Sequence, residues 1–514
     1  MILNISPREY QEKIYETAKK YNTLVVLPTG LGKTLIALML AVERKKAFPT
    51  SKILFLAPTK PLVEQHFEYF KKHLSELFAD LQLFTGAIEA KKRQKIWNTA
   101  EIIFSTPQCV ANDLEKYLYK LDEVSLLIID EAHRCLKNYD YTKVVSFYKN
   151  QGRPEMQRIL GLTASPGHEQ EKIKQICNHL NIEEIEVRSR DSEDVKQYLQ
   201  TLDFNKVDVE FPKEFIEIRV LLRRIYDQQT EKIRKMFPNL YPINKITLLK
   251  LQANLASQIS RQNFHAMIGM SLCAQAIKIS HAIELLETQT LSGLNLYLKS
   301  LLQQAEMKKS KAVQNLVKTP EFNATLISLQ QLLAKKVEHP KIGKLVEIIS
   351  NEMRENSSAK IMVFTQFRET ASTIVNVLSQ NHSIKASTFI GQAKKAAGGL
   401  SQKEQKQIIE KFKTGEINIL VATSIGEEGL DIPEVNAVIF YEPIPSAIRK
   451  IQRAGRTARL APGKLVILVT KDTRDEINHY ASGAREKKMH KVISMMKDEM
   501  KREKNRKTST LSDF

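Results

Sequence analysis

The sequence has few cysteines, a single tryptophan and no long apolar run. Its four cysteines are Cys109, Cys135, Cys177 and Cys273. No two of them are close together, which argues against both a disulfide framework and a zinc site. The longest uninterrupted apolar run, Leu35–Val42, is far shorter than the ~18 residues of a membrane helix. Because the N-terminus also lacks a signal-peptide pattern, we expect a soluble, cytoplasmic protein.

Acidic residues are also scarce relative to basic ones. The chain has 78 Lys and Arg against 58 Asp and Glu, a net charge of +20. The excess is concentrated in residues 212–318, with 16 basic and 7 acidic residues, and in residues 485–507, with 10 and 4. A local surplus of this kind predicts a polyanionic partner, most often nucleic acid. A basic surface that serves solubility fits the composition alone equally well.

The 514 residues are enough for three or four domains. Short apolar runs alternate with helical patterns in two separate regions, which predicts two parallel α/β sheets. The stretch between them has helical spacing only, so the expected fold class is α/β with an all-helical insert. The predicted strands are 24–27, 53–56, 102–104, 126–129, 159–162, 361–364, 419–422, 437–440 and 465–468. The predicted regions are 1–204, 205–335 and 336–483, followed by a basic tail at 484–514 that is predicted to be helical at first.

A phosphate-binding loop is predicted between the first strand and the first long helix of the first sheet. It comprises Thr29, Gly30, Leu31, Gly32, Lys33 and Thr34. The glycines let backbone N–H groups close around phosphate oxygens at the positive end of the helix. Lys33 is expected to reach the β- and γ-phosphates of ATP, and the hydroxyl of Thr34 to hold Mg²⁺. The loop departs from the strict pattern only at its first position, where Leu27 replaces glycine.

Two carboxylates follow another buried strand. Asp130 and Glu131 come directly after the apolar run 126–129, and His133 follows two residues later. Ligands of parallel α/β sheets bind at the carboxyl ends of strands, so these carboxylates are expected to face the phosphate loop. We expect Asp130 to bind Mg²⁺ and Glu131 to orient and deprotonate water. His133 is expected to couple the site to motion. The alternative is that the two acidic residues are ordinary loop residues after a strand.

The second α/β region carries a cluster of arginines. Gln452, Arg456 and Arg459 lie on a predicted loop that runs into a helix. Arginine can stabilise the charge that develops during phosphoryl transfer, and Arg456 and Arg459 are spaced to point the same way. A solvated basic face is the alternative interpretation of this cluster.

Taken together, these segments resemble the superfamily 2 helicases, because many motifs occur in the family's order. Arg8 and Gln11 match its adenine-reading segment, and Asp431 falls near the expected ribose. Thr163 and Ser165 match the segment that couples hydrolysis to motion. Gln452, Arg456 and Arg459 fall on the family's γ-phosphate-sensing positions. The resemblance implies nucleic-acid contacts at Thr59, Lys60, Thr106, Thr365 and Thr423.

Within that superfamily the chain is most similar to the archaeal Hef helicases and their Fanconi anaemia group M relatives. The likeness rests on the segments 28–34, 57–63 and 162–167 and on the helical insert, and it covers about residues 1–480. It implies two RecA-like motor domains and an ATP- and Mg²⁺-dependent 3′→5′ DNA helicase or translocase. The implied substrates are forked and branched DNA, in repair or replication restart, with the insert gripping the duplex arms.

Two departures from that family stand out. Ala458 replaces a glycine of the last motif, a small change. No nuclease region follows residue 483, and the segment 43–45 matches the nuclease's Glu-Arg-Lys only by chance. If the chain is complete, we therefore expect junction remodelling without cleavage.

The C-terminus and the substrate each leave alternatives open. Leu511 and Phe514 resemble a peptide that docks on the sliding clamp, although a frayed terminus explains them equally well. Double-stranded-RNA-sensing and Dicer-type helicases share the inserted helical domain, so duplex RNA is an alternative substrate. A nucleic-acid-binding scaffold with an inactive ATP site is the second alternative.

Overall fold

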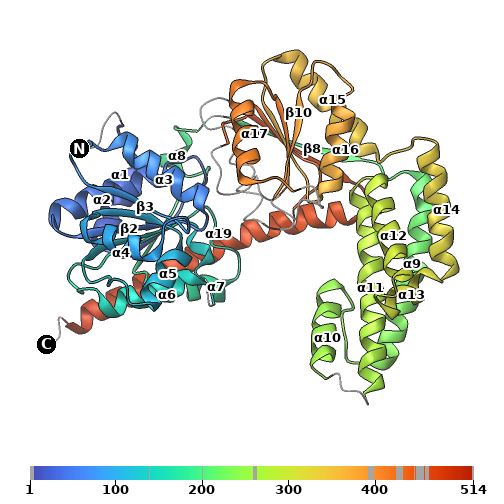
Figure 1. Ribbon diagram of the computed structural model, residues 1–514, viewed down its shortest axis with the longest axis horizontal. Helices are drawn as coiled ribbons and strands as arrows, with labels where there is room; N and C mark the ends of the chain where they lie inside the picture. Colours follow the sequence, from blue (N-terminus) through green and yellow to red (C-terminus); the bar gives the residue numbers. More distant parts are fainter. Residues whose placement is uncertain are drawn as a thin grey trace.

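The computed structural model describes residues 5–137, 139–199, 201–258, 263–391, 399–423, 432–444, 446, 457 and 462–511. For residues 501 and 503–511 it describes the backbone alone. The chain forms two parallel sheets, a helical bundle that comes between them in sequence and a long C-terminal helix (Figure 1). In space the bundle lies on the far side of the second sheet from the first.

The first sheet has seven parallel strands, and the predicted apolar runs form its centre. In spatial order they are β3 (Leu81–Phe84), β4 (Ile102–Ser105), β2 (Lys52–Leu56), β5 (Val124–Ile129), β6 (Ile159–Thr163), β1 (Thr23–Val26) and β7 (Glu184–Val187). The five inner strands are buried at every position, which explains their continuous apolar sequences. The edge strands β3 and β7 are only partly buried and were not predicted.

Helices cover both faces of this sheet. One face carries α1 (Glu9–Lys20), α2 (Lys33–Ala47), α3 (Lys60–His73) and α8 (Glu193–Lys196). The other face carries α4 (Ala90–Thr99), α5 (Pro107–Glu115), α6 (Asp140–Gln151) and α7 (Gln170–Leu180). The sheet is therefore the middle layer of three, and its carboxyl edge stays free for a ligand.

The second sheet has six parallel strands. Their spatial order is β10 (Ala386–Phe389), β11 (Ile419–Ala422), β9 (Ile361–Phe364), β12 (Ala437–Phe440), β13 (Gly463–Thr470) and β8 (Leu202–Val209). One face packs against α15 (Pro340–Glu355) and α16 (Arg368–Leu378), and the other against α17 (Gln402–Thr414). The predicted boundary between residues 204 and 205 needs correction, because it divides β8. This edge strand has an alternating polar sequence and pairs in parallel with β13.

The helical bundle, here called the insert, consists of six helices among the described residues. They are α9 (Lys213–Met236), α10 (Lys245–Ser257), α11 (Phe264–Thr288), α12 (Leu291–Glu306), α13 (Lys311–Val317) and α14 (Pro320–Ala334). A large core joins α9, α11, α12, α13 and α14, and a smaller one joins α10 to α9 and α11. At Gly269 of α11 an added Cβ would lie 2.9 Å from side-chain atoms of both Phe237 and Leu255, so any larger residue would force these two side chains to shift.

Helix α11 is long and apolar enough, by length and composition, to cross a membrane. Its most apolar 18-residue window is 56% buried inside the protein. The buried side chains, among them Ile279, Ile283 and Leu286, pack in the core of the insert. The apolar sequence of α11 is therefore explained by its place as the central helix of the bundle.

The C-terminal helix α19 (Arg474–Leu511) is a single element of 38 residues. It begins beside the insert, passes the second sheet and ends on the first domain (Figure 1). Met489, Ile493 and Met496 are buried there in the core that covers one face of the first sheet. The predicted boundary between residues 483 and 484 therefore falls inside a helix. The basic segment after it is docked on the first domain along one face, because its apolar side chains recur at helical spacing.

A buried ion pair holds the start of α19 in place. The ammonium of Lys341, at the start of α15, pairs with the carboxylate of Asp475, and both side chains are fully buried. The same ammonium donates to the carbonyl oxygens of Thr288 and Tyr441, at 2.9 and 3.1 Å. Lys341 thus joins the insert, the second sheet and α19. Removal of either charge would leave the other buried without its partner, which typically costs ~3–5 kcal/mol.

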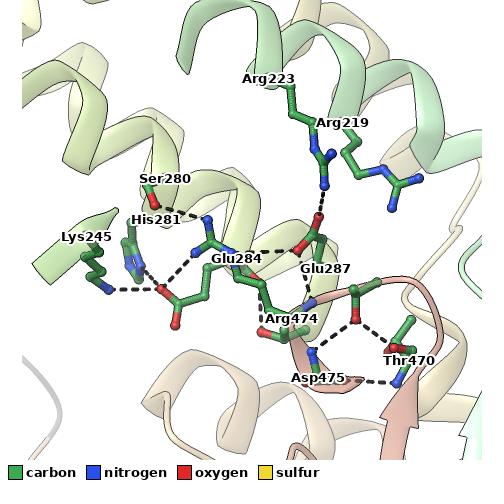
Figure 2. A network of polar contacts seen from close by, with 12 residues as sticks. Arg219, Arg223, Lys245, Ser280, His281, Glu284, Glu287, Thr470, Arg474 and Asp475 are labelled. Atoms are coloured by element: carbon green, nitrogen blue, oxygen red, sulfur yellow. Dashed lines mark hydrogen bonds and ion pairs between the residues drawn. The ribbon is translucent and has the colours of Figure 1, made fainter. Parts of the chain in front are cut away.

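A second polar network fastens α19 to the insert (Figure 2). Arg474 donates to the hydroxyl of Ser280 at 3.1 Å and lies 3.7 and 3.8 Å from carboxylate oxygens of Glu284 and Glu287. The carboxylate of Glu284 also lies 3.1 Å from Lys245. The first turn of α19 is therefore held by the charges of α11.

We expect Glu284→Gln to destabilise the protein at neutral pH but less so in acid. Burial would raise the pKa of Glu284, but His281, Lys245 and Arg474 outweigh it and lower the pKa to about 2. Because this folded-state pKa lies below that of an unfolded glutamate, the carboxylate stabilises the fold above roughly pH 4. That contribution is lost as the pH falls towards 2.

Thermal unfolding of both proteins, followed by circular dichroism, tests this linkage. The difference in stability should be on the order of 2 kcal/mol at about pH 6 and should shrink by roughly half at about pH 3. The exposed Glu306 provides a matched control, Glu306→Gln, with little effect at either pH. A difference for Glu284→Gln that does not change with pH would contradict the assigned pKa shift.

Candidate nucleotide-binding site

The predicted phosphate loop lies between β1 and α2, at the carboxyl edge of the first sheet. Gly30 and Gly32 have φ angles of +87° and +76°, which residues with side chains rarely adopt. Helix α2 begins at Lys33, so its unpaired N–H groups and positive end face the loop. The ammonium of Lys33 donates to the carbonyl oxygen of Leu27 at 2.8 Å. Loop and lysine thus form a cationic cradle.

The predicted base-reading segment packs directly against this loop. The hydroxyl of Tyr10 and the side-chain amide of Gln11 both donate to the carbonyl oxygen of Leu31, at 2.9 and 3.1 Å. A Cβ at Gly32 would lie 2.3 Å from Nε2 of Gln11. The contact between the two segments therefore depends on glycine at position 32.

The two predicted carboxylates follow β5 at the same edge. Asp130 is buried, and Nε2 of His66 lies 2.8 Å from its Oδ2 atom. Burial by itself would raise the pKa of Asp130. The hydrogen bond and charge of His66, together with the nearby Lys33, outweigh burial and lower the pKa below its usual value. Asp130 is therefore ionised at neutral pH, the state in which a carboxylate binds Mg²⁺.

Glu131 leads into the predicted coupling residues. Its backbone is left-handed, with φ +50°, and its Oε2 atom lies 3.2 Å from Nδ1 of His133. The same ring nitrogen lies 3.1 Å from the hydroxyl of Thr163, at the end of β6. Thr163 in turn contacts Ser165, whose backbone N–H donates to the Thr163 hydroxyl at 3.1 Å. The four residues form one contiguous chain of polar contacts.

This chain ends at the C-terminal helix. The hydroxyl of Ser165 donates to the sulfur of Met489 on α19, at 2.8 Å, and both residues are buried. Helix α19 therefore contacts the carboxyl edge of the first sheet as well as the insert. No sequence pattern predicts this contact, because the two residues are more than 300 positions apart.

The residues at this edge fit a nucleoside triphosphate with Mg²⁺. Thr29 has a buried hydroxyl with no hydrogen-bond partner among the described residues, which marks an unfilled polar position in the loop. The two left-handed glycines shape a cradle that side chains would fill. Thr34 and Asp130 supply the hydroxyl and carboxylate oxygens that Mg²⁺ prefers.

Only some of the residues predicted to act in the second domain lie among the described residues. Asp431, Gln452, Arg456 and Arg459 lie outside the described residues. The five predicted nucleic-acid contacts follow carboxyl ends of strands in both sheets: Thr59 and Lys60 follow β2, Thr106 follows β4, Thr365 follows β9 and Thr423 follows β11. Thr365 and Thr423 are buried, and the hydroxyl of Thr365 donates to Glu442 at 3.2 Å.

Two residues of the site were missed by the sequence analysis. His66 on α3 contacts Asp130, as described above, and Tyr198 follows α8. The guanidinium of Arg8 lies over the ring of Tyr198, 5.1 Å from its centroid. A single histidine or tyrosine on a helical pattern carries no signal of its own, so only the fold reveals these contacts.

Three family models match successive parts of the chain. The DEAD/DEAH box helicase model matches residues 8–173, and the helicase conserved C-terminal domain matches residues 340–461. Between them, residues 214–339 match a helical bundle provisionally assigned to ATP-dependent RNA helicases. The solved helicase domain of Hef from Pyrococcus furiosus is 42% identical, with a TM-score of 0.71, and the match covers 94% of this chain and 100% of that one.

The chain belongs to the Hef family of superfamily 2 helicases. This confirms the predicted fold class, two RecA-like domains with a helical insert, and the predicted resemblance. The matched segments of the family models include the phosphate loop and the carboxylates of the first domain.

Curated relatives of this Hef-type chain are longer. A Methanocaldococcus jannaschii protein, provisionally named an ATP-dependent RNA helicase, is 38% identical over 96% of this chain and 61% of its own length. The ATP-dependent DNA helicase mph1 of Sclerotinia sclerotiorum is 34% identical over 91% of this chain and 40% of its own length. The chain thus spans about two fifths to three fifths of these relatives.

We expect Gly32→Ala to weaken ATP binding by roughly tenfold or more. The added methyl group would displace the Gln11 amide, and the left-handed backbone would be strained by ~1–3 kcal/mol. Equilibrium binding of a non-hydrolysable fluorescent ATP analogue measures the effect. Gly86→Ala is the matched control, because a Cβ there meets no atom within 4 Å. Unchanged affinity in Gly32→Ala would show that the Gln11 contact is dispensable.

Proposed function

We propose that this chain is an ATP-dependent 3′→5′ DNA helicase or translocase that unwinds or remodels forked and branched DNA, in repair or replication restart. The observation that carries the proposal is the continuous arrangement at one sheet edge. There Lys33 of the phosphate loop lies near Asp130, and the neighbouring Glu131 contacts His133, which in turn contacts Thr163. The names of mph1 and of the solved Hef helicase domain support the same function.

Each residue of the first domain has a defined task in this proposal. The loop from Thr29 to Gly32 would enclose the phosphates, with Lys33 as their counter-charge. Thr34 and Asp130 would hold Mg²⁺, and Arg8 and Gln11 would contact the base. Glu131 would orient the attacking water and accept its proton. Bound ATP and Mg²⁺ supply the phosphoryl group and the charge that makes it reactive.

The proposal for the second domain rests on the family motifs. Asp431 would lie near the ribose, and Gln452, Arg456 and Arg459 would complete the site from across the cleft. Because these residues fall within the sequence of the second α/β domain, ATP binding would favour closure of the two domains.

The insert supplies the surface for a polyanion. No Asp or Glu occurs between Glu231 and Glu284. The basic residues there are Lys232, Arg234, Lys235, Lys245, Lys250, Arg261 and Lys278. Tyr241 and Phe264 in the same region are 91% and 69% exposed. Exposed rings among cations suit the bases and phosphates of nucleic acid, and binding should weaken with salt.

The main alternative keeps the motor but changes the nucleic acid. The helical-bundle model and the Methanocaldococcus jannaschii relative both carry RNA-helicase names, which keeps duplex RNA as the second candidate substrate. The other alternative, a scaffold with an inactive ATP site, is disfavoured because Lys33, Asp130 and Glu131 are all in place.

Two finer points belong to the proposal. Docking of Leu511 and Phe514 on a sliding clamp stays a prediction, and Phe514 lies outside the described residues. Unchanged clamp binding after deletion of residues 511–514 would dispose of it. A protein that acts on chromosomal DNA would work inside the cell.

ATP hydrolysis by the purified chain tests the function. Forked DNA, linear duplex DNA, single-stranded DNA and duplex RNA are compared as activators. We expect the strongest stimulation by forked DNA, and stimulation by duplex RNA instead would overturn the substrate. No turnover with any of them would leave the scaffold interpretation standing.

The variant Lys33→Ala should lose at least ~100-fold in ATP turnover, because it removes the charge that stabilises the reacting phosphates. Its affinity for forked DNA should stay within about twofold, since phosphate contacts on the insert do not involve the loop. Lys72→Ala, an exposed lysine on α3, is the matched control and should keep full turnover. Full turnover in Lys33→Ala would refute the assignment of the ATP site.

A further inference from the structure

One buried histidine contacts both residues that are proposed to hold Mg²⁺. Nε2 of His66 lies 2.8 Å from Oδ2 of Asp130, and Nδ1 lies 3.4 Å from the hydroxyl oxygen of Thr34. Thr34 belongs to α2, Asp130 follows β5, and His66 comes from α3. The imidazole therefore joins the two other segments to α3.

The chemistry of the Asp130 carboxylate fixes the direction of its hydrogen bond with His66. An ionised carboxylate can only accept, so Nε2 of His66 carries the proton and donates to Asp130. Nδ1 of the same ring lies within hydrogen-bond distance of the Thr34 hydroxyl, so one imidazole holds both groups at once. The contact with His66 involves only Oδ2 of Asp130 and leaves Oδ1 free of the ring.

The ring is held by packing as well as by hydrogen bonds. His66 is 6% exposed, and its ring lies against Phe55 of β2 with centroids 4.5 Å apart. Phe55 in turn contacts the rings of Phe70 and Phe104. A side chain enclosed by an aromatic cluster has few alternative rotamers, so it can impose its orientation on its partners.

We propose that His66 is a positioning residue that orients Asp130 and Thr34 for Mg²⁺ and does not itself touch the nucleotide. This inference rests on the proposed function of the site. Outer residues that orient metal ligands typically contribute 10–100-fold to metal affinity. Loss of His66 should therefore weaken the Mg²⁺-dependent part of nucleotide binding and spare the part that depends on the phosphate loop.

The experiment measures binding of a fluorescent, non-hydrolysable ATP analogue at equilibrium, with Mg²⁺ and with EDTA. Wild-type protein should bind more tightly with Mg²⁺. For His66→Ala the gain from Mg²⁺ should fall by roughly tenfold, while the affinity in EDTA should stay within about twofold. Gln65→Ala, the exposed neighbour on the same helix, should match wild type in both conditions.

Two conservative variants separate positioning from packing. Glutamine can place an amide N–H near the position of Nε2, so His66→Gln should recover much of the gain from Mg²⁺. His66→Asn is too short to reach Asp130 and should not recover it. If His66→Ala does not fold, as judged by circular dichroism, the comparison of the glutamine and asparagine variants decides in the same way.

The outcomes distinguish this inference from the proposed function. A folded His66→Ala with the wild-type gain from Mg²⁺ overturns the positioning role, as does an equal gain in the glutamine and asparagine variants. Absence of analogue binding to wild type in both conditions overturns the ATP site itself. If His66→Ala loses the same affinity for the analogue with Mg²⁺ as with EDTA, His66 serves the packing of the loop. That result also overturns its role towards the metal.

Discussion

Parallel pairing in the first sheet is the constraint on which the site depends. Because all seven strands run in the same direction, every carboxyl end lies at one edge. Residues from the phosphate loop after β1, the carboxylates after β5 and the segment after β6 therefore meet, although more than 100 positions separate Lys33 from Thr163. The sheet is buried on both faces, so its backbone is rigid and holds these loops at fixed spacing.

Charge burial at this edge is tolerated because each group has a partner. Asp130 sits behind His66 with Lys33 nearby, and Glu131 lies beside His133. The same rule applies at the start of α19, where the fully buried Lys341 faces Asp475 and two carbonyl oxygens. Such pairs add little net stability compared with apolar packing, but they are intolerant of change, and so they fix which segments meet.

The sequence predicted the parts of the fold that are buried on all sides. The apolar runs of β1, β2, β5 and β6 have one physical cause, burial on both faces, and so their sequences reveal them. The polar edge strand β8 is not buried on both faces, so its sequence does not reveal it, and a predicted domain boundary divided it.

In the site, Lys33 and Asp130 were predicted from local spacing after strands. His66 and Met489 were not, because their contacts come from tertiary packing that no short pattern records.

The length of α19 has a mechanical consequence. Its first turn is tied to α11 through Arg474, and about four turns later Met489 contacts Ser165 beside the candidate nucleotide site. No break in the helix separates the two contacts. The first domain and the insert therefore cannot shift relative to each other along α19 without loss of the Ser165 contact or the Arg474 pairs. Ser165 is joined to Glu131 through Thr163 and His133. A rearrangement around the Glu131 carboxylate and a movement of the insert therefore both act on α19. The insert, which carries the basic surface, is thus physically connected to the chemistry of a site on another domain.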